Sequence, residues 1–215
     1  MRTGRNLQKV GSMASKGLMR LHRRSMEIQS EPKVTREAER AAAYIVIELL
    51  NLWASFSKYY FISTALGARS RSGLGYTASP SPNSNVALGL AIVVEKPKAS
   101  ARPDGSWHRR DEPDWHNPHV LQRVLEKNSC SNHHIVDNII SGSADLFRTL
   151  PVFRNYFAHK NFQTYQAAMT LAPSFGVSVA RRPVDVILAP ALSGPNIVLV
   201  EWVDEIQIAV DYLCY

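Results

Sequence analysis

The sequence predicts an all-α fold, a helical bundle interrupted by a long loop insertion. Two segments carry this prediction, because their apolar residues recur at the spacings of three and four that place side chains on one face of a helix. One segment ends near Leu66, and the other lies between Trp202 and Leu213. Apolar residues make up 45% of the 215 residues, which supports a packed core and argues against a disordered chain.

Residues 1–30 are predicted to be a basic, partly disordered arm, and residues 31–215 are predicted to be the helical domain. The first 40 residues hold ten basic and four acidic side chains, so they account for most of the net charge of +7. A basic arm suits a polyanion such as RNA, DNA or an anionic membrane face. A solvated tail is the alternative, and the absence of acidic residues before Glu27 is also typical of an organelle transit peptide.

A long helix is predicted from about residue 36 to Leu66. Thr35 is a favourable N-cap, and two glutamates in the first turn place negative charge at the positive end of the helix dipole. Gly67 is suited to ending the helix. The apolar stripe of this helix consists of Ile45, Leu49, Leu52, Trp53, Phe56 and Tyr60.

Residues 68–117 are predicted to be a long insertion that is ordered only in part. Proline and glycine punctuate this stretch and interrupt any regular periodicity. A compact domain rarely carries so many residues without structure. We therefore expect the apolar run from Val86 to Val94 to dock as a short helix or strand.

Helical patterning returns at Pro118, which suits the first turn of a helix. We expect a short helix as far as Lys127, followed by a second helix that Ser131 or Asn132 caps.

A third short turn is predicted to begin after Ser143, and Pro151 is predicted to open a new helical segment that ends at Leu171. Two runs of β-branched residues near the C-terminus favour a small β-ribbon, residues 184–188 and 197–200.

The sequence predicts neither a metal site nor a cofactor. Cys130 and Cys214 are too few for a disulfide framework and indicate a reducing compartment, so we expect a cytoplasmic protein. Glu48 and Lys58 interrupt the most apolar stretch, which we interpret as a core helix and not as a membrane span. One group of histidines and aspartates is open to interpretation as a metal site, but its spacing matches no closed site, and a polar loop is the simpler interpretation. Its candidate ligands are His108, Asp111, Asp114, His116 and His119.

The richest chemical cluster is the stretch from Arg154 to Lys160. Arg154 offers a fixed fork of donors for phosphate oxygens, and His159 exchanges a proton near neutral pH. Asn155 is able to orient a hydroxyl or an imidazole. Residues five apart on a helix point about 140° apart, so Arg154 and His159 reach one ligand only if the helix ends between them or if two copies of the segment face each other. An ordinary surface helix with a hydrogen-bonded histidine is the alternative interpretation.

The sequence Arg154-Asn155-x-x-x-His159 resembles the R-x4-6-H signature of the HEPN superfamily, in which a polar residue often follows the arginine. The likeness covers most of residues 36–215, and the motif is its only sharp part. It implies an all-α fold and, for many members, a metal-independent ribonuclease activity. The further stretches that resemble bacterial HEPN-type proteins are residues 49–56, 150–153 and 202–206.

The resemblance implies a homodimer in which the two motif segments line one cleft for RNA. His159 would act as general base or acid, Arg154 would stabilise the charge that develops at phosphorus, and Asn155 would position the reacting groups. The ribose 2′-hydroxyl would attack the adjacent phosphate and leave a 2′,3′-cyclic phosphate and a 5′-hydroxyl. Lys160 and the basic arm would attract phosphates without sequence preference.

Arg181 and Arg182 are further candidate RNA contacts, with a solvated pair as the alternative. Some HEPN toxins carry a tyrosine two residues after the histidine, where an antitoxin modifies it. Asn161 stands at that position here, so the resemblance does not imply this form of regulation.

Two other functional interpretations stay open. HEPN folds also serve as non-catalytic nucleotide- or partner-binding modules, and a basic DNA-binding or structural protein would depend on its arm alone. The leading interpretation is an endoribonuclease of bacterial stress response, of a toxin–antitoxin pair or of phage defence. It includes an antitoxin or another regulatory protein as an expected partner.

Overall fold

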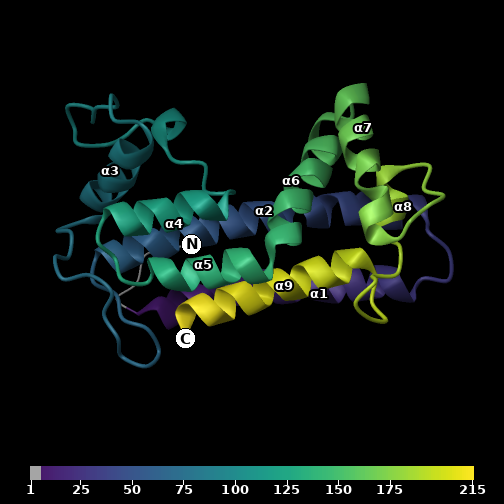
Figure 1. Ribbon diagram of the computed structural model, residues 1–215, viewed down its shortest axis with the longest axis horizontal. Coiled ribbons are helices and arrows are strands. Elements are labelled where there is room, and N and C mark those ends of the chain that lie inside the picture. The colour runs from purple at the N-terminus through teal and green to yellow at the C-terminus, as the bar shows by residue number, and fades with distance from the viewer. Residues whose placement is uncertain (1–5) are drawn as a thin grey trace. The chain divides into compact units, whose positions relative to one another are not determined.

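The computed structural model describes residues 6–215, and this part of the chain is helical (Figure 1). It contains isolated β-bridges but no β-strand within residues 6–215, so the predicted all-α class is confirmed. Two 3₁₀ helices join the α-helices, η1 (Arg109–Asp111) and η2 (Ala172–Phe175). The α-helices are α1 (Leu7–Ser30), α2 (Arg36–Ala65), α3 (Ser84–Glu95), α4 (Pro118–Lys127), α5 (His133–Gly142), α6 (Ala144–His159), α7 (Phe162–Thr170), α8 (Pro183–Ile187) and α9 (Val198–Cys214).

The chain folds into two compact units, and α1, α2 and α9 each contribute to both. Unit 1 contains the chain up to Ala14, together with Trp53–Gly142 and Ala209–Tyr215. Unit 2 contains Ser15–Leu52 and Ser143–Ile208. The division therefore falls within α1 and not at residue 30, where the arm was predicted to end.

Residues 7–30 of the predicted arm form the helix α1. Small residues on the buried face explain why the apolar pattern is weak in the sequence. A Cβ atom added to Gly17 would lie 2.9 Å from Cδ2 of Leu52, so glycine permits close packing there. Arg2 and Arg5 of the arm lie outside the described residues. The buried side chains of α1 include Val10, Ala14, Leu18, Leu21 and Ile28.

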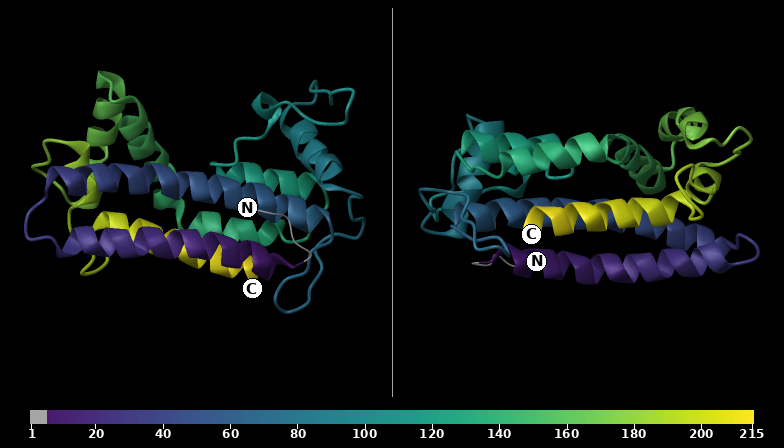
Figure 2. Two further views of the ribbon diagram at one scale, coloured as in Figure 1. Left: turned by 180° about the vertical axis from the view of Figure 1, so that it is seen from behind. Right: turned by 60° about the horizontal axis from the view of Figure 1, so that its bottom comes forward.

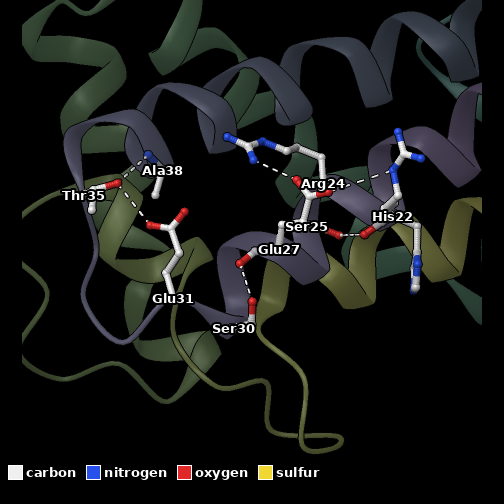
Figure 3. A network of polar contacts seen from close by, with 9 residues as sticks. His22, Arg24, Ser25, Glu27, Ser30, Glu31, Thr35 and Ala38 are labelled. Carbon is white, nitrogen blue, oxygen red and sulfur yellow. Dashed lines mark hydrogen bonds and ion pairs between the residues drawn. The ribbon is translucent and has the colours of Figure 1, made fainter.

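α2 begins and ends where the sequence predicts. The Thr35 hydroxyl accepts a hydrogen bond from the Ala38 backbone N–H at 3.1 Å, which confirms the N-cap (Figure 3). Gly67 has a φ of 81°, and the N–H of the next residue, Ala68, donates to the Ser63 carbonyl at 2.9 Å. This pairing closes the C-terminal turn in the way that favours glycine.

The insertion is ordered around α3, which confirms a short helix for the apolar run from Val86 to Val94. Two ion pairs hold the insertion within unit 1. The Arg123 guanidinium makes two hydrogen bonds to Glu95, at 2.7 and 2.8 Å. The Lys58 ammonium lies 2.7 Å from a carboxylate oxygen of Glu112.

The core of unit 1 contains the large aromatic side chains of α2. Trp53, Phe56, Tyr60 and Phe61 are fully buried. Asn132 was predicted as one of two possible caps of α5, but its side chain does not cap the helix. Its amide enters this core and donates to the Tyr60 hydroxyl at 2.8 Å.

In unit 2, α1 runs alongside α9 (Figure 2). His22 Nε2 lies 3.3 Å from Asp204 Oδ1, and the Gln207 amide donates to the Ser15 hydroxyl at 2.9 Å. The hydroxyl of Ser25 on the same helix donates to the His22 carbonyl at 2.8 Å (Figure 3). Among residues 6–215, no helix is both long enough and apolar enough to cross a membrane.

Pro151 lies inside α6 and does not open a new segment, which corrects the prediction for this region. Proline cannot donate the i to i−4 hydrogen bond, so tertiary packing must maintain the helix across this position. The packing is aromatic. The ring of Phe153 lies 5.4 Å from Trp202 and 6.0 Å from Phe175 between ring centroids. Ser143 precedes α6 at the N-cap position but makes no capping hydrogen bond through its side chain.

The predicted β-ribbon is also wrong. Residues 184–188 lie in and just after α8, and residues 197–200 lie at the start of α9, which begins at Val198. Pro183 in the first turn and the Asp185 carboxylate, which accepts from the Arg182 N–H at 2.9 Å, both favour a helix start there. Among the described residues, the one β-bridge near these runs joins Ile197 to Pro190, which follows the first run and lies outside it.

Candidate nucleic-acid interface

The candidate residues lie on the helical hairpin that α6 and α7 form in unit 2 (Figure 1). α6 ends at His159, because Lys160 turns into the left-handed region with φ 48° and ψ 37°. The Lys160 N–H still donates to the Tyr156 carbonyl at 2.8 Å. Asn161 then caps α7 by accepting from the Thr164 N–H at 2.9 Å. His159, Lys160 and Asn161 therefore occupy the tip of a rigid, short-turned hairpin.

The guanidinium of Arg154 has unused hydrogen-bonding capacity. Its Nη1 donates to Asn155 Oδ1 at 3.4 Å, a long hydrogen bond. Its Nε is buried and has no hydrogen-bond partner within the described part of the chain. A guanidinium carries five N–H donors, and within residues 6–215 only an Nη1 donor of Arg154 has a hydrogen-bond partner.

α6 is a continuous helix through both ends of the motif. Arg154 and His159 therefore leave the helix axis about 140° apart, and the helix does not end between them. Asn155 and His159 are four residues apart on one exposed face. Arg154 and His159 would reach one ligand either if the helix ended between them or if two copies of the segment faced each other. Because the helix does not end between them, a shared ligand requires a second α6 that faces the first.

Aromatic side chains accompany the motif. Phe162, the first residue of α7, is 71% exposed beside the tip. The rings of Tyr156 and Tyr165 lie 6.2 Å apart. Burial raises the pKa of Tyr156, and the neighbouring Tyr165 raises it further, so this phenol is neutral at physiological pH.

The three predicted RNA-binding cations differ in their surroundings. Lys160 and Arg181 are exposed and form no ion pair with a carboxylate of residues 6–215. Arg182 is already neutralised. It forms ion pairs with Glu39 and, at 2.7 Å, with Asp185. We therefore withdraw Arg182 from the candidate RNA contacts.

A basic face on α1 was missed by the sequence analysis. Lys16, Arg20 and Arg23 are spaced four and three residues apart, all are exposed, and they lie opposite the buried apolar face. This row, the α1 basic face, ends at Glu27, which accepts a hydrogen bond from Arg24 at 2.8 Å (Figure 3). The spacing is visible in the sequence, but it has this meaning only once residues 7–30 are known to be helical.

The histidines of the insertion do not assemble into a metal centre. His108 contacts the Arg102 guanidinium at 2.8 Å, and His116 lies 3.0 Å from Asp114. Across residues 6–215, no group of three histidine, cysteine, aspartate or glutamate side chains is arranged to hold a metal ion.

No protein-family model, no curated protein and no solved structure matches this chain.

Proposed function

We propose that the protein is a metal-independent endoribonuclease of the HEPN type that acts as a homodimer. The observation that carries the proposal is the state of the Arg154 guanidinium, which is half-buried beside Asn155 with its Nε unpartnered. A buried, unpartnered cationic donor is costly unless an anion binds it, and a phosphate has the matching geometry. The exposed His159 at the end of the same helix supplies a proton-transfer group.

The direction of the two side chains supports the proposed homodimer. Because Arg154 and His159 point about 140° apart, the arginine of one copy and the histidine of the other would share a phosphate between two facing α6 helices. A two-fold arrangement would create two equivalent reaction centres in one cleft, each with Arg154 from one copy and His159 from the other.

The proposed reaction is an internal transesterification. His159 takes the proton from a ribose 2′-hydroxyl, whose oxygen forms a bond to the adjacent phosphorus. The bond from phosphorus to the 5′-oxygen breaks, and that oxygen takes up the proton that His159 has received and leaves as a 5′-hydroxyl. Arg154 stabilises the negative charge on the non-bridging oxygens, and Asn155 orients the imidazole or the hydroxyl. DNA lacks the 2′-hydroxyl and is not a substrate.

Substrate attraction is assigned to cations outside the motif. Lys160 is the residue after His159, and Arg181 is exposed in the same unit. The α1 basic face adds three more cations, of which Arg23 already lies 4.0 Å from a Glu27 carboxylate oxygen. These contacts would be to phosphates, so they contribute affinity without sequence preference. The proposal extends to a cytoplasmic role in stress response, in a toxin–antitoxin pair or in phage defence, which is the setting that the resemblance implies.

Cleavage of RNA in the presence of EDTA tests the proposal. The wild-type protein is expected to release products with 2′,3′-cyclic phosphate ends, and His159→Ala and Arg154→Ala are each expected to lose about 100-fold or more in rate. Arg148→Ala on the same helix and His119→Ala in unit 1 are matched controls that should retain activity. Equal cleavage by all variants, or no cleavage by the wild type, would remove the catalytic proposal. Nucleotide or protein binding without any product would support a non-catalytic module instead.

Mixing the two inactive variants tests the shared cleft. If each reaction centre takes Arg154 from one copy and His159 from the other, a mixed dimer contains one intact combination. Activity should therefore reappear when the two variants are co-refolded and should be absent from either variant alone. No recovery from a mixture shown to contain mixed dimers would exclude this arrangement.

A further inference from the structure

A groove of about 520 Å³ lies beside α3, within the insertion of unit 1 and outside the α6–α7 hairpin. One wall is α3, which contributes Val86, Leu90 and Val93. The other wall is the loop that follows α3, which contributes Ala101 and Trp107. The lining is almost entirely apolar, and we call this feature the α3 groove.

A specific fit between Trp107 and Gly89 builds the groove. A Cβ atom added to Gly89 would lie 2.6 Å from Cζ2 of the indole, so only glycine allows the ring to rest on the helix. The indole N–H donates to the Asn85 carbonyl at 3.2 Å. The loop is thereby fixed against α3 in a way that leaves the neighbouring apolar side chains uncovered.

The uncovered side chains form a regular stripe. Val86, Leu90 and Val93 are 43%, 41% and 46% exposed, at positions i, i+4 and i+7 of one helix. Single exposed apolar residues are ordinary on protein surfaces, whereas a row of three beside an apolar groove marks an interaction site. This spacing is also the one by which helices recognise each other's apolar faces.

The charges around the groove are predominantly positive. Lys98 and Arg109 make no contact with a carboxylate of the described chain, and Lys96 donates only to a backbone carbonyl. Two of the nearby carboxylates are neutralised, since Glu95 pairs with Arg123 at 2.7 Å and Glu112 pairs with Lys58 at 2.7 Å.

Two further carboxylates belong to the same segment. Asp111 lies 3.9 Å from the Arg110 guanidinium. Asp104 accepts hydrogen bonds from Ser106 and has no cation within ion-pair distance. Along α3 and the loop that follows it, residues 84–112, the cations Lys96, Lys98 and Arg109 are unpaired, whereas Asp104 is the one carboxylate without an ion pair, so the balance favours an acidic ligand.

We propose that the α3 groove binds an acidic amphipathic helix of another protein. The apolar residues of this partner helix would pack against the stripe of Val86, Leu90 and Val93. Its glutamates or aspartates would face the unpaired cations Lys96, Lys98 and Arg109. A second copy of this chain is a poor occupant. A two-fold pairing of two α3 grooves would bring their like-charged lysines and arginines together.

Selection from a displayed library of short helical peptides tests this inference with the full-length protein. The enriched peptides are expected to carry apolar residues at positions i, i+4 and i+7 with glutamate or aspartate on the flanks. Leu90→Asp and Val86→Asp should each weaken a selected peptide about tenfold or more, because they place a carboxylate in the apolar groove. Leu192→Asp, at an exposed apolar position of unit 2, is the matched control and should leave the affinity unchanged.

A second pair of variants tests the charge argument. Lys98→Glu and Arg109→Glu should weaken the same peptide and reduce the dependence of its affinity on salt. Circular dichroism of each variant reports whether the helices persist. The proposal is overturned if no peptide is enriched, if the enriched peptides are basic, or if they bind Leu90→Asp as well as the wild type. It is also overturned if RNA competes for the groove and Leu90→Asp weakens that RNA binding.

Discussion

The side chains of Asn132 and Tyr60 form a hydrogen bond of 2.8 Å inside the core of unit 1. Both side chains are fully buried. The same amide nitrogen lies 3.3 Å from the Thr64 hydroxyl, so one asparagine connects the start of α5 to two successive turns of α2. Burial raises the pKa of Tyr60 well above its usual value, so the phenol stays neutral and its oxygen accepts this bond.

Removing the Tyr60 hydroxyl is expected to destabilise the protein. Tyr60→Phe leaves one amide donor of Asn132 with only the longer contact to Thr64, and an unsatisfied buried donor costs about 1–3 kcal/mol. Urea unfolding should show this loss. Tyr44→Phe, at an exposed position of α2, is the control and should change the free energy of unfolding by less than about 0.5 kcal/mol. Equal losses in the two variants would contradict the role of the buried bond.

The hydrogen bond between Asn132 and Tyr60 could not be predicted from the sequence, although the helices that it connects could. The helices α2 and α9 were predictable because their bulky apolar residues recur at spacings of three and four, a pattern typical of a helix that packs one face against a core. Asn132 was correctly associated with the start of α5, but an asparagine suits both an N-cap and a buried hydrogen bond. Only the position of Tyr60, far away in the sequence, decides between these roles.

The two helices whose extent differs from the prediction, α1 and α6, share a physical cause. The buried face of α1 contains Gly11, Ala14 and Gly17, whose low hydrophobicity hides a close helix contact. In α6, Pro151 indicates a helix start by local rules, but aromatic packing around Phe153 continues the helix through it. In both cases tertiary contacts outweigh the local propensities on which sequence prediction depends.

The candidate site was predictable in its chemistry and not in its geometry. The residue types from Arg154 to Lys160 already indicate phosphate chemistry. The unpartnered Nε of Arg154 depends on packing that no spacing reveals. The neutralisation of Arg182 likewise depends on Glu39, which lies 143 residues away in the chain.

Lys160→Gly is expected to separate stability from RNA binding. Lys160 has a φ of 48°, a conformation that costs a side chain-bearing residue about 1 kcal/mol and that glycine adopts freely. The variant should therefore unfold at a higher urea concentration than the wild type, while its affinity for RNA falls because a phosphate contact is lost. Lys160→Ala, which removes the charge and keeps the strain, should lose affinity without gaining stability. RNA affinity equal to the wild type in both variants would remove Lys160 from the interface.

Glu205 is expected to make unit 2 less stable as the pH rises. Burial raises the pKa of this carboxyl above its usual value, and the nearby charge of Glu201 raises it further. A raised pKa means that the folded state holds the proton more tightly than the unfolded chain. The resulting stabilisation is present at low pH and is lost as the pH rises through the raised value. Glu205→Gln should therefore gain stability relative to the wild type as the pH rises from the ordinary pKa of a glutamate through the raised pKa of Glu205.

Urea unfolding at several pH values measures this trend. Glu126→Gln, at an exposed position of α4, is the matched control. The same trend with pH in both variants, or a Glu205→Gln difference that shrinks as the pH rises, would contradict the assignment.

The α1 basic face is expected to contribute to RNA affinity through phosphate contacts. Replacing Lys16, Arg20 and Arg23 by glutamine removes three cations that lie on one exposed face of the helix. For single-stranded RNA, the slope of the logarithm of affinity against the logarithm of salt concentration should decrease in magnitude by about 2, since each phosphate contact contributes about 0.7. A 2′-O-methyl oligonucleotide keeps the measurement independent of cleavage. The control variant replaces Lys33, Arg40 and Lys127, three exposed cations outside this face, and makes the same change in net charge. A larger or equal change of slope in the control would mean that affinity follows the total charge of the protein and not this face of α1.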